Sequence, residues 1–264
     1  MRKYLSQINK ALDKFLPPET EGILAKAMRY SVLSPAKRFR PILTLATCEA
    51  VGGDVRQALP AACAIEFIHT YTLIHDDLPA MDNDDFRRGQ PTSHKVFGEA
   101  MAILAGDALN TLAFQLIAEY AHKNKAVEVI KELAKALGIS GVVGGQVLDL
   151  GSQGKALRPE TLNLIYKKKT GALIRAAVRI GGILGGAKEK ELESLTSFGE
   201  HLGLAFQITD DLLDQGPYLK LFGSKEARKL AEKERDLAIS RLKELGPKAD
   251  TLKQLAKFVV GRKR

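Results

Sequence analysis

Apolar residues recur every three or four positions along most of this chain of 264 residues, which is the spacing that lines one face of an α-helix. No stretch alternates apolar and polar residues between hairpin turns, so no β-sheet is predicted. Several segments are apolar on nearly every face, as central helices of a large bundle are. Helical spacing covers residues 23–31, 42–49, 61–74, 100–121, 126–137, 159–184, 189–213 and 218–245.

The connections between these segments are short and rich in glycine, and no linker, repeat or low-complexity tract divides the chain. A chain of this length can bury a substantial core. We therefore expect one all-α domain that spans residues 1–264.

The composition is that of a soluble globular protein, with 45% hydrophobic and 27% charged residues. Cys48 and Cys63 are the only cysteines and lie in apolar helical segments, so we expect no disulfide and a reducing, cytoplasmic location. The first residues lack the apolar core of a signal peptide. No uncharged apolar stretch approaches the roughly 20 residues of a membrane span, so none is expected.

The net charge of +9 raises the possibility of nucleic-acid binding. Residues 220–264 hold 14 Lys or Arg against six Asp or Glu, so almost all of the surplus lies in this last segment. The segment holds only Phe222 and Phe258 as aromatic residues and has no interleaved aromatic platform for base stacking. A solvated helix face explains it better than a nucleic-acid footprint, and we expect no nucleic-acid partner.

Two aspartate-rich stretches are the most informative chemistry in the chain. The first holds Asp76, Asp77 and Asp82, and the second holds Asp210, Asp211 and Asp214. Each ends an apolar run, where an unpaired carboxylate is costly to bury. Mg²⁺ takes few protein carboxylates and completes its shell with water and substrate phosphates. The pair therefore predicts metal-assisted chemistry on a diphosphate.

The two stretches differ in geometry. Asp210 and Asp214 are four residues apart and share one helix face. Asp76 and Asp82 are six apart, with Pro79 between them, and proline disrupts a helix interior. We expect the helix to break there and to bring Asp82 back towards Asp76.

Two groups of basic residues lie in the first half of the chain. Arg87 and Arg88 follow the first aspartates and offer donor forks for phosphate oxygens. Lys37 and Arg40 precede Pro41, which suits a first helical turn, where anions bind favourably.

These motifs together resemble the short-chain trans-isoprenyl diphosphate synthases. The resemblance covers essentially the whole chain and implies a single-domain, isoprenoid synthase-type helical bundle around a central cavity, usually as a homodimer. The matching segments are Ile68–His75 with the first aspartates and 87–89, then Gly144-Gly145-Gln146 with Asp149-Leu150, Lys169–Ala172, and Phe206–Ile208 before the second aspartates.

The resemblance also implies a role for each matching residue. It implies roughly three Mg²⁺ ions when substrate is bound, held by Asp76 and Asp82 with Asp77 in support, and by Asp210 and Asp214 with Asp211. Allylic diphosphate would meet Arg87, and Lys169, Thr170 and Gln207 would lie beside it and the nascent carbocation. Isopentenyl diphosphate would meet Lys37, Arg40, His69 and Arg88.

The expected reaction is ionisation of an allylic diphosphate to a carbocation, followed by attack of the double bond of isopentenyl diphosphate. In this family the departing diphosphate accepts the proton, so no protein base is predicted, and His75 is expected to pack or support the metal site. Dimethylallyl and geranyl diphosphate would be the allylic substrates. Farnesyl diphosphate would be the product.

Product length depends on the side chains that close the apolar cavity. Tyr71 lies five residues before Asp76, with Thr72 beside it, and this pattern resembles bacterial farnesyl diphosphate synthases. An aromatic side chain that merely packs in the core is the alternative for Tyr71. A synthase of geranylgeranyl diphosphate is the enzymatic alternative.

The chain departs from the family in two places. Pro35-Ala36 stand where two glycines usually precede the basic motif. After Asp214 the family carries roughly two dozen further loop residues, whereas this chain continues at once into Pro217. We expect residues to be missing from the chain there; a true deletion would favour a non-catalytic prenyl synthase subunit.

Overall fold

The computed structural model describes residues 2–155 and 157–262 of the chain. Its backbone divides into two compact units, one of residues Met1–Ile42 and Arg56–Ile130 and the other of Leu43–Val55 and Lys131–Arg264. Helices α3 (Phe39–Ala50), α4 (Val55–Asp76) and α7 (Lys123–Leu137) contribute residues to both.

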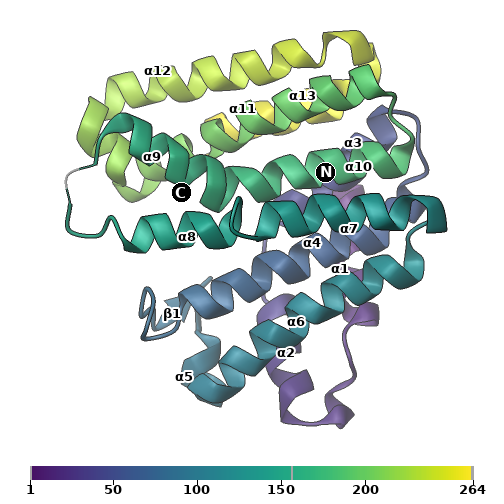
Figure 1. The fold of residues 1–264 in the computed structure, drawn as a ribbon, viewed down its shortest axis with the longest axis vertical. Coiled ribbons are helices and arrows are strands. Elements are labelled where there is room, and N and C mark those ends of the chain that lie inside the picture. The colour runs from purple at the N-terminus through teal and green to yellow at the C-terminus, as the bar shows by residue number, and fades with distance from the viewer. Residues whose placement is uncertain (1, 156, 263–264) are drawn as a thin grey trace. The chain divides into compact units, whose positions relative to one another are not determined.

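The first unit is built around α4 (Figure 1). Residues 61–68 of this helix are all buried, so it is covered on every face and its apolar composition is explained. Helix α2 packs against α6, and so does the short α5. The other elements of the unit are α1 (Arg2–Phe15), η1 (Glu19–Glu21), α2 (Ile23–Leu33), β1 (Phe86–Arg87), β2 (Gln90–Pro91), α5 (Ser93–Phe97) and α6 (Glu99–Tyr120).

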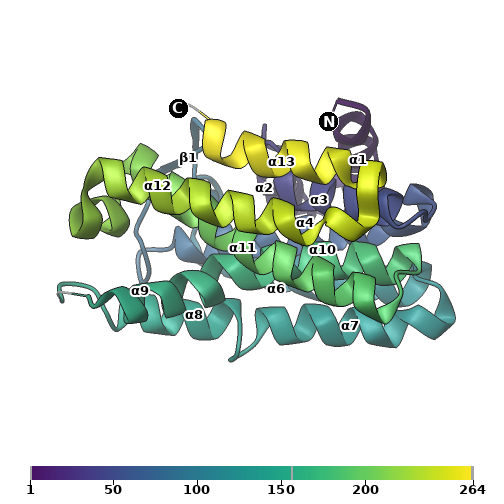
Figure 2. The same ribbon diagram turned by 90° about the horizontal axis from the view of Figure 1, so that it is seen from above.

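The second unit consists of helices joined by short turns. Helix α12 runs along α11, and this is the most extensive helix contact of the unit (Figures 1 and 2). Its elements are α8 (Val142–Leu150), α9 (Pro159–Tyr166), η2 (Lys167–Gly171), α10 (Ala172–Gly185), α11 (Glu189–Asp214), α12 (Pro217–Arg241), η3 (Lys243–Ala249) and α13 (Asp250–Gly261).

Glycine allows α11 to approach η2 closely. A Cβ atom at Gly203 would lie 2.8 Å from the Cα atom of Gly171, so a larger residue would force the two elements apart. The contact fixes the position of α11 along η2, the turn that carries Lys169 and Thr170.

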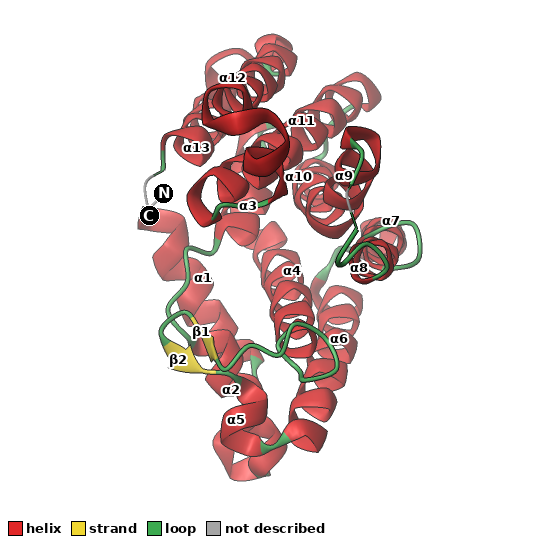
Figure 3. Ribbon diagram, turned by 90° about the vertical axis from the view of Figure 1, so that its left-hand side faces the viewer, coloured by secondary structure: helices red, strands yellow, loops and turns green. Residues whose placement is uncertain are grey.

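The prediction of an all-α fold is confirmed, and the single domain over residues 1–264 stays a prediction. Two local features differ from the expected pattern. Residues 86–91 form a small antiparallel hairpin, drawn in yellow in Figure 3. The segment expected as one helix over 159–184 is interrupted by the π-helical turn η2. Cys48 and Cys63 are both buried and form no disulfide.

Two helical stretches, Glu99–Tyr120 and Lys123–Leu150, are long and apolar enough, by length and composition, to cross a membrane. The same test is passed by core helices of soluble proteins. In the first stretch Asp107 lies mid-helix with an exposed carboxylate, a costly group in a bilayer. The expectation of no membrane span therefore stays a prediction.

Candidate functional site

The first aspartate motif lies in the first unit, where α4 ends. The backbone N–H of Asp82 donates to the carbonyl of Asp76 at 2.8 Å, and that of Asn83 donates to Leu78 at 3.1 Å. Pro79 sits inside this turn. The predicted break is confirmed, and it returns the backbone of Asp82 to that of Asp76.

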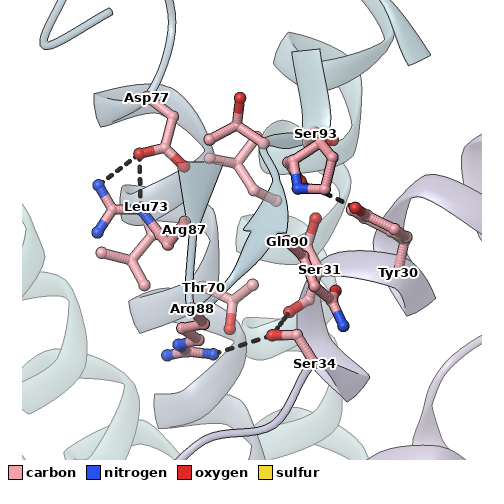
Figure 4. A pocket seen from close by; sticks show the side chains of 13 residues that line it. Tyr30, Ser31, Ser34, Thr70, Leu73, Asp77, Arg87, Arg88, Gln90 and Ser93 are labelled. Carbon is pink, nitrogen blue, oxygen red and sulfur yellow. Dashed lines mark hydrogen bonds and ion pairs between the residues drawn. The ribbon is translucent and has the colours of Figure 1, made fainter. Parts of the chain in front are cut away.

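Asp77 is buried beneath the hairpin and pairs with Arg87. The carboxylate accepts hydrogen bonds from Nε of Arg87 at 2.6 Å and lies 2.5 Å from Nη2 (Figure 4). Burial raises the pKa of Asp77, and the Arg87 guanidinium opposes that shift. Arg87 also reaches Asp84 at 3.0 Å. Asp77 therefore anchors the hairpin to the end of α4.

The hairpin turn places Arg88 beside Arg87. Arg88 and Gly89 form a two-residue loop with φ of 54° and 77°, the left-handed conformation that tight hairpins use. Nη1 of Arg88 donates to the hydroxyl of Ser34 at 3.2 Å (Figure 4). Burial lowers the pKa of Arg88. A cavity of about 40 Å³, large enough for water, lies between these side chains.

Two residues of the predicted diphosphate pocket, Arg40 and His69, lie side by side in the same unit. Nη1 of Arg40 lies 3.3 Å from Nε2 of His69. Burial, followed by the charges of Arg40 and Arg88, lowers the pKa of His69 well below 6.5. The imidazole is therefore neutral at neutral pH, amid cations that suit an anionic ligand. Lys37 is exposed at the start of this segment.

Arg38 was missed by the sequence reasoning and proves to be structural. Its guanidinium is buried and donates to Glu66 at 2.8 Å, to the carbonyls of Val32 and Ser34 at 2.6 and 3.0 Å, and to Asn9 at 3.1 Å. Arg38 itself has a left-handed φ of 48°. This clasp fixes the backbone from which Arg40 extends.

Tyr71, Thr72 and His75 lie on α4 before the motif. Tyr71 is nearly buried, its ring meets the His75 ring edge-on at 5.5 Å, and burial raises its pKa to about 12. Nε2 of His75 lies 3.1 Å from the Ile103 carbonyl oxygen, and the His75 ring packs against Gly106. Thr72 donates to the His69 carbonyl at 2.8 Å. Packing by His75 was expected; the chain-length role of Tyr71 and Thr72 stays a prediction.

The second motif lies in the second unit, at the end of α11. Asp211 is buried and accepts hydrogen bonds from the Tyr166 hydroxyl and from the backbone N–H of Tyr218, the latter at 2.8 Å. Burial raises the pKa of Asp211, against the hydrogen bond from Tyr166. The tyrosine rings stack with centroids 5.5 Å apart. Asp211 therefore joins α11, α9 and α12.

The connection after Asp214 is a closed turn. Gln215 has a φ of 59°, and the N–H of Gly216 donates to the Asp211 carbonyl at 2.8 Å. A Cβ atom on Gly216 would lie 2.4 Å from the Asp211 carboxylate. The turn closes without the longer loop of the family, and the expectation that residues are missing there stays a prediction.

Lys169 and Thr170 lie in η2, and Gln207 of α11 contacts Thr170. Lys169 Nζ lies 2.7 Å from a carboxylate oxygen of Asp149. The Thr170 hydroxyl donates to the Gln207 amide oxygen at 2.7 Å. Single π-helical turns occur frequently at functional sites.

The carboxylates of both motifs divide into two classes. Asp77 and Asp211 are buried, whereas Asp82 and Asp214 are exposed and Asp76 and Asp210 are partly exposed. The four more open residues provide only oxygen donors, which suit Mg²⁺. Among the described residues no three His, Cys, Asp or Glu side chains surround one point as a ready metal site.

Arg262 was also missed as a neighbour of the second motif. Its Nη2 lies 2.7 Å from Oδ1 of Asp210. Burial lowers the pKa of this arginine. A cation therefore already stands against one of the expected metal ligands.

Comparison with known proteins identifies the family. A profile of the polyprenyl synthetase family matches residues 21–223. Geranylgeranyl pyrophosphate synthase 4 of Arabidopsis thaliana is 51% identical over 212 residues, which cover 79% of this chain and 57% of that protein. Farnesyl diphosphate synthase of Geobacillus stearothermophilus is 48% identical over 223 residues, which cover 81% of this chain and 75% of that protein.

A solved structure matches nearly end to end. The apo crystal structure of an FPP/GFPP synthase from Zymomonas mobilis has a TM-score of 0.93 and 40% identity, and the match covers 98% of this chain and 97% of that one. The predicted kinship with the short-chain trans-isoprenyl diphosphate synthases is confirmed, and the chain belongs to the polyprenyl synthetase family.

Proposed function

We propose that this protein is a Mg²⁺-dependent farnesyl diphosphate synthase, a geranyltranstransferase that condenses isopentenyl diphosphate with dimethylallyl and then geranyl diphosphate. The observation that carries the proposal is the division of labour in both aspartate motifs. In each, one buried aspartate holds the local fold while the other two are more exposed to solvent.

The open carboxylates would hold the metal: Asp76 and Asp82 in the first motif, Asp210 and Asp214 in the second. Bound Mg²⁺ neutralises negative charge on a leaving diphosphate. Asp77 contributes indirectly, because its ion pair aims Arg87 from the hairpin next to the first motif. Arg87 is in turn available to bind phosphate oxygens through its remaining N–H groups.

The chain's own residues would bind and orient the two substrates. Arg40 and Arg88 carry positive charge near the neutral imidazole of His69. Together with Lys37, they would bind isopentenyl diphosphate. In the second unit, Lys169 would bind the allylic diphosphate, while the oxygens of Thr170 and Gln207 would stabilise positive charge on the allyl group. We propose no protein group as the base that accepts the proton lost in the last step.

We infer a farnesyl product because Tyr71 presents a bulky, nearly buried ring on the helix that leads to the first motif. The relatives include synthases named for farnesyl and for geranylgeranyl diphosphate, so geranylgeranyl diphosphate is the second candidate. Replacing Tyr71 by Ala removes the ring and should lengthen the product to C20 or beyond. Thr72→Ser, one position away, is the matched control. Unchanged product length in Tyr71→Ala would show that the ring only packs.

We also propose a cytoplasmic homodimer. In the second unit Ile139, Val143 and Val147 recur every four residues and all are exposed, Ile139 at 87%. Such an apolar ridge is costly in water and is typical of a surface that another subunit covers. Sedimentation should give twice the mass of the chain, and a monomer at micromolar concentration would contradict this.

The function is tested by incubating the protein with Mg²⁺, dimethylallyl diphosphate and isopentenyl diphosphate and identifying the prenyl alcohols after phosphatase treatment. The proposal predicts farnesol. Geranylgeraniol would favour the second candidate. No elongation by a folded protein would favour a non-catalytic subunit, for which the short turn after Asp214 is the structural argument.

A further inference from the structure

Arg262, the residue after α13, is held against α11 by three contacts within the second unit. Its Nη2 lies 2.7 Å from Oδ1 of Asp210 and donates to the carbonyl of Phe206 at 2.9 Å. The guanidinium carbon lies 4.1 Å from the centre of the Phe206 ring. Only 8% of the Arg262 side chain is exposed, whereas 33% of the Asp210 side chain is.

The protein satisfies this guanidinium incompletely. Nε of Arg262 is buried and has no partner among the described residues. Arg38, the structural arginine of the first unit, instead donates from Nε, Nη1 and Nη2. Buried polar groups that serve only stability are nearly always paired. Arg262 is thus less completely hydrogen-bonded than Arg38. The carboxylate that pairs with Arg262 belongs to Asp210, an expected metal ligand.

We propose that Arg262 is an internal counter-ion of the second aspartate motif, which occupies Asp210 in the metal-free protein and is displaced when Mg²⁺ binds there. The inference rests on the proposed function, in which Asp210 is a metal ligand. Both cations use the same carboxylate. A dication bound to it repels a guanidinium held against the same group.

The ion pair between Arg262 and Asp210 stabilises the end of α11 in the metal-free protein. Asp210 and Asp214 are four residues apart on α11, where like charges destabilise a helix. A positive charge at Asp210 offsets that repulsion, and it also lowers the affinity of the motif for metal. Metal binding would then release the Arg262 side chain from the surface of α11.

A supporting role for Arg262 predicts the opposite sign. If the guanidinium oriented Asp210 for the metal, as outer partners of metal ligands often do, its removal would weaken metal binding. A counter-ion makes removal strengthen it. The direction of the change therefore decides between the two roles.

Mn²⁺ is a suitable probe, because free Mn²⁺ is counted directly by electron paramagnetic resonance without catalysis. We expect Arg262→Gln to bind Mn²⁺ roughly twofold to fivefold more tightly than the wild type, which corresponds to the free energy of a partly exposed ion pair. Arg235→Gln is the matched control: it removes one positive charge from the same unit, where Arg235 pairs with Asp236. Its affinity should equal that of the wild type.

Equal or weaker binding by Arg262→Gln would overturn the proposal. A wild type that binds no Mn²⁺ would instead remove the proposed metal function on which it rests. A second measurement needs no variant: Mg²⁺ should accelerate tryptic cleavage after Arg262 in the wild type, detected by mass. Cleavage that is indifferent to Mg²⁺ would also count against displacement.

Discussion

The buried ion pair between Arg38 and Glu66 offers the sharpest test of how the diphosphate pocket is supported. Replacing Arg38 by Met keeps much of the side chain's length but leaves the Glu66 carboxylate buried without its counter-charge. It also removes the donor from two backbone carbonyls and from Asn9. Removing one partner of a buried ion pair lowers the free energy of unfolding by about 3–5 kcal/mol.

Urea denaturation followed by circular dichroism measures this loss as a shift of the unfolding midpoint. In thermal unfolding it corresponds to a fall in Tm of roughly 6–15 °C for a chain of this size. The same variant should bind isopentenyl diphosphate more weakly, because the clasp fixes the backbone that carries Arg40.

Two further variants serve as controls. Arg235→Met removes an exposed pair and should change stability by less than about 0.5 kcal/mol. The double variant Arg38→Met, Glu66→Leu should recover much of the loss, since apolar replacement of a whole buried pair is often neutral. A loss below about 1 kcal/mol for Arg38→Met alone would refute the reasoning.

Two other predictions concern single residues. Because the pKa of His69 in the folded chain lies well below its ordinary 6.5, the unfolded chain takes up a proton first as pH falls; stability should drop below pH 6.5 by about 1.4 kcal/mol per unit. His69→Gln should flatten that part of the stability profile, and an unchanged slope would contradict the assignment. Asp211→Ala should cost about 2–4 kcal/mol, because it leaves the Tyr166 hydroxyl and Tyr218 N–H unpaired. The Mn²⁺ affinity of Asp211→Ala should equal that of the wild type within about twofold. A large loss of Mn²⁺ affinity would show that Asp211 is itself a metal ligand.

The helices were predictable from the sequence because apolar spacing is a local property. The break at Pro79 was predictable for the same reason, since proline limits its own backbone whatever surrounds it. The hydrogen bond from Asp82 to Asp76 follows from that break.

The pairing of individual carboxylates was not predictable. Asp210 and Asp211 are neighbours of the same type, yet one meets Arg262 and the other meets Tyr166. Those partners lie 52 and 45 positions away, so only the packed fold selects them. The buried role of Arg38 was hidden likewise, because its partner Glu66 is 28 positions away, on α4.

The most direct test of the central claim substitutes one of the more exposed aspartates in each motif and measures the release of inorganic diphosphate from geranyl and isopentenyl diphosphate with Mg²⁺. Asp76→Asn and Asp210→Asn should each slow turnover by about a hundredfold or more while the fold stays intact. The wild type should release one diphosphate for each farnesyl diphosphate formed. Turnover by Asp76→Asn or Asp210→Asn at the wild-type rate would contradict the account.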